Sequence, residues 1–199
     1  MPRWFGKIAL LLWVPLAVIP GVSLLAGHLT SLPAPQSGDT VLTTNLDALF
    51  PATTHTLRAV HVLYERCGCS SRVAQTLLAR GARADVRELV IIVGDDEKTI
   101  DPVRVAALRA RNFPVALLST KAAAERLHVV AVPLLMIVDA GDRIRYAGGY
   151  TNRSESRVIE DARVIAEVTA GRQPDPLPIF GCAVAASLQR TLDPLRLKY

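Results

Sequence analysis

Residues 59–81 read AVHVLYERCGCSSRVAQTLLARG, and this segment decides the fold. Its first six residues are mostly apolar and β-branched or aromatic, which predicts a buried strand that ends at Tyr64. After the cysteines, Ser70 or Ser71 can cap a helix that ends near Gly81. Apolar residues recur at helical spacing along this helix, namely Val73, Ala74, Leu77 and Leu78. The segment therefore predicts a strand, a cysteine motif and a helix in immediate succession.

The same alternation continues toward the carboxyl end. Residues 88–94 (ELVIIVG) predict a second strand that is buried on both faces, as in parallel sheets. We then expect a helix with Pro102 in its first turn, a strand over residues 113–119 and a short helix over residues 121–129. Short apolar runs that alternate with helical periodicity are typical of an α/β domain.

Residues 132–150 (VPLLMIVDAGDRIRYAGGY) predict an antiparallel hairpin with its turn at residues 140–142. Ser154 is expected to open the last long helix, which would end at Gly171. The residues predicted to share its apolar face are Val158, Ala162, Ile165 and Ala166. The sequence thus predicts a domain over residues 47–172, followed by a carboxyl-terminal extension over residues 173–199.

The amino-terminal segment has the composition of a membrane anchor. Residues 8–27 (IALLLWVPLAVIPGVSLLAG) are 20 residues without a formal charge, enough for a helix of roughly 30 Å. Arg3 and Lys7 precede this run, and such charges stay on the cytoplasmic side of a membrane. We predict a single-pass anchor over residues 1–28, with a cleaved signal peptide as the alternative. Residues 29–46 are polar and contain prolines, which indicates a linker.

Charge and cysteine content restrict the class of protein. Without Arg3 and Lys7 the net charge of +5 falls to +3, and acidic and basic residues are mixed throughout. This pattern does not indicate binding to nucleic acid. Three cysteines allow at most one intramolecular disulfide, so the chain is not a disulfide-stabilised scaffold.

Cys67 has surroundings that favour a reactive thiolate. It lies at the predicted start of a helix, where unpaired backbone N–H groups and the helix dipole stabilise negative charge. Arg66 and Arg72 add positive charge nearby, while Glu65 opposes them. Such features lower the pKa of a cysteine. We predict that Cys67 is a nucleophile.

The other two cysteines offer partners for Cys67. Cys69 can resolve a mixed disulfide formed at Cys67, although a C-x-C bridge closes a very small ring. Cys182 can serve as a third partner if the extension folds back over the helix start. The alternative for Cys182 is a buried thiol that packs the extension.

The cysteine pair also suits a metal ion. The thiolates of Cys67 and Cys69 are soft ligands for Cu(I). Cys182, His61 or His128 would complete such a site, but neither histidine has ligand spacing to the cysteines, so we interpret both as structural. Neither a zinc site nor an iron–sulfur cluster is supported by this set of residues.

A strand that leads into a cysteine motif at a helix start, a later Val132-Pro133 pair and a closing helix together resemble the thioredoxin fold. The resemblance is to the membrane-anchored thioredoxin-like proteins of the bacterial periplasm, and it covers roughly residues 59–170. The extension, taken with the letters CGCS, is weakly similar to bacterial RedB-like proteins. The resemblance implies a central mixed sheet that is flanked by helices.

The same resemblance assigns roles to particular residues. It implies that Cys67 is the attacking cysteine and that Pro133 is cis, faces the cysteines and shapes a groove for an extended substrate. The family motif is Trp-Cys-Gly-Pro-Cys, whereas this chain has no tryptophan there and one residue between its cysteines. Ser70 stands where the second cysteine of that motif would be.

We therefore expect a membrane-tethered periplasmic protein that exchanges thiols and disulfides with exported proteins. Its catalytic residues would be Cys67, Cys69 and Pro133, with Cys182 as a further partner, and it would need no cofactor. One alternative is a Cu(I)-binding or copper-delivery module that uses Cys67 and Cys69. A second alternative is a redox-silent binding domain that keeps the fold.

Overall fold

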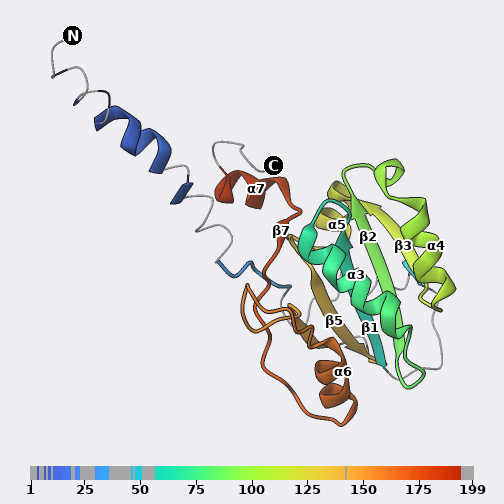
Figure 1. Ribbon diagram of the computed structural model, residues 1–199. Helices are drawn as coiled ribbons and strands as arrows, with labels where there is room; N and C mark the ends of the chain where they lie inside the picture. Colours follow the sequence, from blue (N-terminus) through green and yellow to red (C-terminus); the bar gives the residue numbers. More distant parts are fainter. Residues whose placement is uncertain are drawn as a thin grey trace.

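The computed structural model describes residues 57–141 and 143–193. It also describes residues 30–35, 46 and 48–50, and within the first 22 residues it describes 4, 7, 9, 11–18 and 21–22. Figure 1 shows one sheet with helices packed on both of its faces. The predicted α/β class is confirmed.

The sheet has five strands in the order β3-β2-β1-β5-β6. The first three strands along the chain are parallel to one another, namely β1 (Leu57–Tyr64), β2 (Arg87–Gly94) and β3 (Val115–Ser119). On the other side of β1, β5 (Leu134–Asp139) pairs antiparallel, and β6 (Ile144–Gly148) pairs antiparallel with β5. The sheet is therefore mixed, and the predicted hairpin over residues 132–150 is confirmed.

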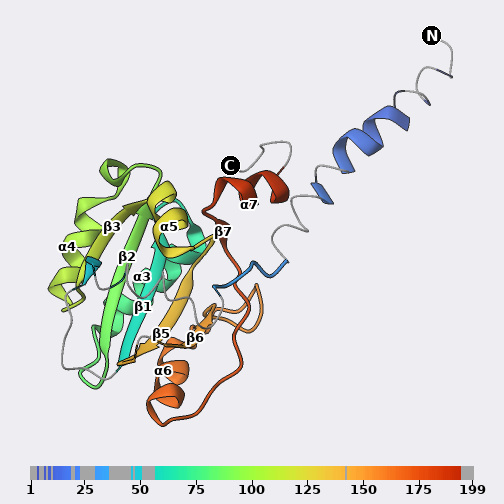
Figure 2. The ribbon, with the colours of Figure 1, turned by 180° about the vertical axis from the view of Figure 1, so that it is seen from behind.

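Alternate side chains of the strands point to two separate cores, because successive residues of a strand face opposite sides of a sheet. In β1, Ala59 and Leu63 pack against the face that carries α3 (Gly68–Arg80), α4 (Pro102–Ala110) and α6 (Asp161–Thr169). Val60 and Val62 point to the opposite face, where α5 (Thr120–Leu127) lies. Figure 2, seen from behind, shows α5 on this second face. A single 3-10 turn, η1 (Glu97–Thr99), follows β2.

A second, two-stranded sheet joins the extension to the domain. Its strands are β4 (Ala131–Val132) and β7 (Cys182–Ala183), which pair antiparallel. The peptide bond between Val132 and Pro133 is cis, as the resemblance implies. After β7 the chain continues into α7 (Ala186–Leu192). The extension is thus packed against the residues that directly precede β5.

The start of α3 differs from the prediction. The helix begins at Gly68 with Cys67 as its N-cap residue, so neither Ser70 nor Ser71 caps it. The Ser70 hydroxyl instead accepts a hydrogen bond from the backbone N–H of Tyr64, at 3.0 Å. This bond ties the first turn of the helix to the end of β1.

The predicted start of the last long helix is wrong, and of its predicted buried face only Ile165 is buried. The helix α6 begins at Asp161, seven residues after Ser154, and its buried residues are Asp161, Val164, Ile165 and Val168. Val158 is 68% exposed, and the predicted face positions Ala162 and Ala166 are exposed too. The physical reason is Asp161, whose buried carboxylate lies 2.7 Å from the guanidinium of Arg80 in α3. This ion pair fixes which side of the helix faces the core.

The predicted membrane anchor falls mostly on residues that the structure does not describe. Of this run, residues 11–18 are helical, and the side chains of Leu11, Leu12 and Trp13 are 72%, 66% and 66% exposed. Within the described part of the chain, no helix is both long enough and apolar enough to cross a membrane. The other positions of the anchor and most of the linker lie outside the described residues.

Candidate thiol site

The structure brings all three cysteines to the amino-terminal end of α3. Cys67 is the N-cap of that helix and is only 1% exposed. Cys69 lies in the first turn and is half-buried. Cys182 reaches the same place from β7, also half-buried, and all three side chains are thiols without a disulfide. The extension thus folds back over the helix start, which is the condition under which Cys182 could serve as a partner of Cys67.

Backbone pairing brings Cys182 to this position. In the register of the small sheet, Cys182 lies opposite Val132, the residue before the cis proline. The backbone N–H of Val184 donates to the carbonyl of Val130 at 2.8 Å. Upstream, the N–H of Gly149 donates to the carbonyl of Leu177 at 2.7 Å. These bonds hold the extension on both sides of the cysteine.

Hydrogen bonds lower the pKa of Cys67. The thiol of Cys182 makes the largest contribution and that of Cys69 the second, and both lower the pKa of the Cys67 thiol well below its ordinary value. Burial opposes this shift, while the backbone and hydroxyl of Ser70 add to it. A thiolate that accepts several hydrogen bonds is stabilised relative to the thiol. These hydrogen bonds therefore favour the thiolate form of Cys67.

The flanking charged residues do not act as the sequence suggested. Arg66 is paired with Asp95, with 2.8 Å between Nη1 and Oδ2. Arg72 donates to the backbone carbonyl of Ser156 at 3.2 Å. Glu65 lies 3.2 Å from Arg104 rather than beside the thiol. The largest causes of the low pKa of Cys67 are the neighbouring thiols and Ser70, and neither arginine is among them.

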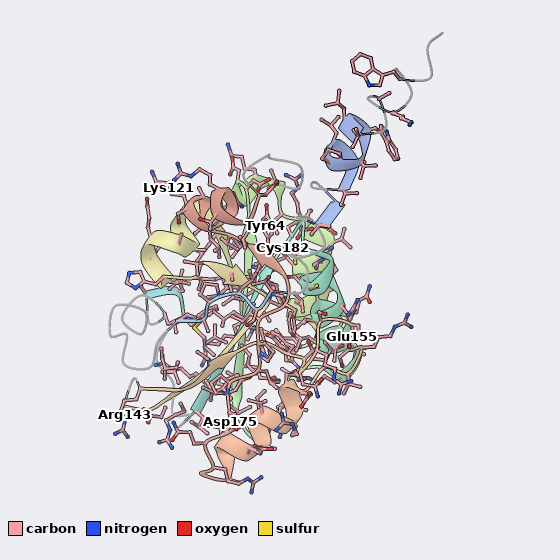
Figure 3. All side chains as sticks on the ribbon, turned by 90° about the vertical axis from the view of Figure 1, so that its left-hand side faces the viewer. Tyr64, Lys121, Arg143, Glu155, Asp175 and Cys182 are labelled. Atoms are coloured by element: carbon pink, nitrogen blue, oxygen red, sulfur yellow. The ribbon has the colours of Figure 1, made fainter. Side chains whose placement is uncertain are left out.

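Tyr64 is a neighbour of the site that sequence reasoning missed. Figure 3 shows Tyr64 close to Cys182, and negative charge on Cys182 contributes to raising the pKa of the tyrosine hydroxyl. Burial is the largest cause of that shift, followed by the hydrogen bond that the hydroxyl donates to Asp95. The one available signal was the position of Tyr64 at the end of the strand that leads into the cysteines.

Removing the Cys182 thiol should raise the pKa of Cys67, because its largest stabilising hydrogen bond is lost. We expect the pH profile of Cys67 alkylation to move to higher pH in Cys182→Ala, and to move less in Cys69→Ala. Peptide-resolved mass spectrometry after iodoacetamide labelling across a pH series measures both profiles. Equal midpoints in the wild type and Cys182→Ala would show that the thiolate is stabilised by something else.

A small pocket beside Cys69 brings Pro133 into the site. Its lining includes Cys69, Pro133, Tyr150 and Phe180, which come from α3, the position between β4 and β5, the loop after β6 and the extension. Pro133 therefore lies where the resemblance placed it, next to the cysteine motif. Phe180, two residues before Cys182, was not expected from the sequence to contribute to this pocket.

His61 belongs to a different, largely buried cluster between the sheet and α3. Its Nε2 lies 3.1 Å from Oε1 of Glu88, and its Nδ1 lies 2.9 Å from the hydroxyl of Tyr150. Arg80 completes the cluster, since its guanidinium donates to the carboxylates of Glu88 and Asp161. This arrangement supports the structural interpretation of His61. His128 lies at the exposed carboxyl-terminal end of α5.

The two groups of candidate metal ligands differ in geometry. The ligand atoms of His61, Glu88 and Asp161 all lie within 4.8 Å of one another. However, Arg80 already supplies a positive charge to both carboxylates, so this cluster does not need a metal ion. Within the described residues, the three cysteine sulfurs do not form a group that close. Their contacts are instead centred on Cys67.

The buried cluster should make the fold sensitive to acid. Burial raises the pKa of Glu88, but hydrogen bonds from Arg80 and His61 outweigh it and lower the pKa from 4.5 to about 2. Between these two values the unfolded chain binds more protons than the folded one. The contribution of Glu88 to stability is therefore complete above about pH 4.5 and is lost as the pH falls through about 2.

Urea unfolding at a series of pH values measures this effect. We expect the free energy of unfolding to fall across that window in the wild type and to fall less steeply in Glu88→Gln, which has no proton to gain there. Parallel curves for the two proteins would show that other carboxylates dominate acid unfolding.

Comparisons with known proteins identify a similar fold but no function. No family model and no curated protein matches the chain. Among solved structures, it is similar to the hypothetical protein SMc02350 from Sinorhizobium meliloti 1021, with a TM-score of 0.53 and 19% identity over 65% of this chain and 79% of that one. An uncharacterized conserved protein from Geobacillus kaustophilus has a TM-score of 0.48 and 16% identity, over 78% of this chain and 97% of that one. At such low identity, the first likeness concerns the fold alone.

Proposed function

We propose that this chain is a thiol–disulfide exchange protein in which Cys67 is the nucleophile. The observation that carries the proposal is a buried sulfur that accepts hydrogen bonds from two other thiols. A thiolate is the reactive form of cysteine. A second thiol in contact with it is what a two-step exchange requires.

The reaction transfers two electrons from the protein to a substrate disulfide. The Cys67 thiolate attacks one sulfur of the substrate, forms a mixed disulfide and expels the other sulfur as a thiolate. A second cysteine of the chain, as its thiolate, then attacks the Cys67 sulfur and releases the first substrate sulfur. The substrate ends as two thiols and the protein ends with one internal disulfide. The reverse sequence oxidises a substrate dithiol.

Cys182 is the partner best placed to form that internal disulfide. It approaches Cys67 from a separate strand, so the bond would join two different elements of the fold. A bond from Cys67 to Cys69 would close a very small ring within one turn, which strains disulfide geometry. We assign Cys69 to supporting the Cys67 thiolate and to resolving mixed disulfides when Cys182 is displaced.

The wider proposal is a membrane-tethered, periplasm-facing protein that resembles thioredoxin-like proteins. The mixed sheet, the cysteine at a helix start and the cis proline beside it support the fold part of this proposal. The exposed apolar side chains of residues 11–18 support the tether. The substrates would be exported proteins that present a cysteine pair or a disulfide.

Reduction of insulin by dithiothreitol tests the exchange activity of the full-length chain. We expect the protein to accelerate the appearance of insulin precipitate above the rate given by dithiothreitol alone. An unchanged rate, together with no exchange against glutathione disulfide, would refute the proposal and favour a redox-silent domain.

Cu(I) binding is the second candidate, because the soft thiols of Cys69 and Cys182 both interact with Cys67. Cys67, Cys69 and Cys182 would hold the ion, after β7 moved so that all three sulfurs could reach it. Titration with Cu(I) against a competing chelator tests this function. Tight binding of one equivalent that is lost in Cys67→Ser would support it, whereas binding no tighter than that of the serine variant would rule it out.

A further inference from the structure

The amino-terminal part of the chain is attached to the extension directly beside the thiol site. Leu32 forms an antiparallel bridge with Ile179, and its backbone N–H donates to the Ile179 carbonyl at 2.9 Å. Ile179 comes three residues before Cys182. Both residues of the bridge belong to the core on the α5 face of the sheet, with 6% and 1% exposure. Leu32 is therefore a fixed point of the domain.

The part of the extension that receives Leu32 is itself packed into the domain. The backbone N–H of Gly149 donates to the Leu177 carbonyl at 2.7 Å, and a Cβ atom at Gly149 would lie 2.0 Å from the Pro178 carbonyl oxygen. On the other side of Cys182, residues 183–185 are buried. The bridge and the cysteine therefore belong to one packed unit.

The bridge makes the predicted linker short. The apolar run of the proposed anchor ends at Gly27, so four residues separate it from Leu32. An extended chain spans at most about 3.5 Å per residue, so the path from Gly27 across the bridge to Cys182 covers at most about 30 Å. A tether that was free as far as the buried Leu46 would by itself span about 65 Å.

This short path restricts which partners meet the thiol site. With the anchor in a bilayer, the cysteines stay within about 30 Å of its surface, which is about the diameter of a small domain. A cysteine held farther out, at the distal end of a large ectodomain, is beyond their reach. A cysteine held near the surface of the same membrane is instead presented at high effective concentration. The geometry therefore favours partners that are confined to that membrane.

We propose that the exchange partner of the thiol site is another membrane protein, whose cysteine pair or disulfide lies within about 30 Å of the bilayer surface. The bridge between Leu32 and Ile179 sets this height. The inference rests on the proposed exchange function and on the proposed tether. It narrows the substrate class from exported proteins in general to those that act at the membrane surface.

The first test measures exchange on vesicles that carry the full-length chain with its domain outside. One probe is a phosphatidylethanolamine whose headgroup bears a pyridyldithio group, and the other is the same pyridyldithio acid without the lipid. The Cys67 thiolate attacks the sulfur on the acid side of either probe and forms a mixed disulfide. Pyridinethione leaves with the electron pair of the broken bond, and its absorbance gives the rate.

Two insertion variants separate the role of the bridge from that of total chain length. Each carries the same flexible Gly/Ser insert of about 20 residues. One insert stands between His28 and Leu29, before the bridge, and the other stands between Ser37 and Gly38, after it. We expect the first insert to slow the reaction with the lipid probe about tenfold, because effective concentration falls steeply with tether length. The second insert is the matched control and should change nothing, as should either insert with the soluble probe.

A second test measures the height of the site without any exchange reaction. The side chain of Arg66, next to Cys67, is 73% exposed. A fluorophore is attached to Arg66→Cys in the full-length Cys67→Ser/Cys69→Ser/Cys182→Ser background, and energy transfer to a labelled lipid headgroup gives its distance from the bilayer. We expect about 30 Å or less with the native tether and with the insert after the bridge, and a larger distance with the insert before it.

The outcomes distinguish this inference from the functions on which it rests. Failure of the chain to bind vesicles would overturn the tether and the inference together. Binding without reaction toward either probe would overturn the exchange function. If the chain binds and reacts, equal effects of the two inserts, or a label far beyond 30 Å with the native tether, would refute the membrane-surface partner alone.

Discussion

Replacing Cys67 with serine should reduce insulin reduction to the rate of dithiothreitol alone, a loss of about a hundredfold or more in the catalysed rate. The reason is that hydrogen bonds from the other two thiols favour the thiolate form of Cys67. A serine hydroxyl has no comparable acidity. The measurement is the precipitation rate at equal protein concentrations.

The two other serine variants are the controls for this result. Cys182→Ser should leave the first attack in place but slow the second step, so mixed disulfides at Cys67 accumulate and can be detected by mass spectrometry. Cys69→Ser should have the smaller effect, because Cys182 remains in contact with Cys67. Full activity in Cys67→Ser would show that another thiol is the nucleophile.

Replacing Arg80 with methionine should lower the free energy of unfolding by about 3–5 kcal/mol. Arg80 donates to the carboxylates of Glu88 and Asp161, which are only 2% and 1% exposed. Without the guanidinium, the two buried carboxylates lose the positive charge that they share. Methionine fills similar space, so the decrease in the free energy of unfolding measures mainly the loss of the positive charge. Urea unfolding at neutral pH gives the value.

Arg83→Met is the matched control for the loss at Arg80. Arg83 pairs with Asp85 at 2.7 Å, but these side chains are 27% and 50% exposed. Pairs that remain in water contribute little, so we expect a change below about 1 kcal/mol. Equal losses in the two variants would mean that the buried cluster has no special role in stability.

Local patterns in the sequence predicted much of the fold. The strands β1 and β2 were predicted correctly because both are buried on two faces, and such strands appear in a sequence as continuous apolar runs. The hairpin of β5 and β6 was predicted because its turn residues stand between two apolar runs. Each of these signals is contained within a few neighbouring residues.

The errors arose where distant residues decide the local structure. The buried face of α6 includes Asp161, which pairs with Arg80, 81 residues away in the sequence. Apolar spacing alone cannot reveal such a pair. In the same way, local charges at Arg66 and Arg72 suggested how the thiolate is stabilised, whereas the structure assigns this role mainly to Cys182.

The candidate site was predictable in its members but not in its arrangement. Cys67, Cys69 and Pro133 were identified from their order along the chain and from the resemblance. The position of Cys182 depends on pairing between β4 and β7, and two-residue strands leave no periodicity to detect. Gly181 was the remaining indication in the sequence. It is needed because a Cβ atom there would collide with the backbone carbonyl of Val132, and only the structure places these two residues together.

The most direct test of the exchange site is a disulfide map of the full-length chain, equilibrated across a series of glutathione potentials and quenched by alkylation. We predict one internal disulfide, between Cys67 and Cys182, that opens and closes reversibly within this range. Three free thiols at every potential, or a bond that leaves Cys67 reduced, would contradict the assignment of Cys67 as the exchanging cysteine.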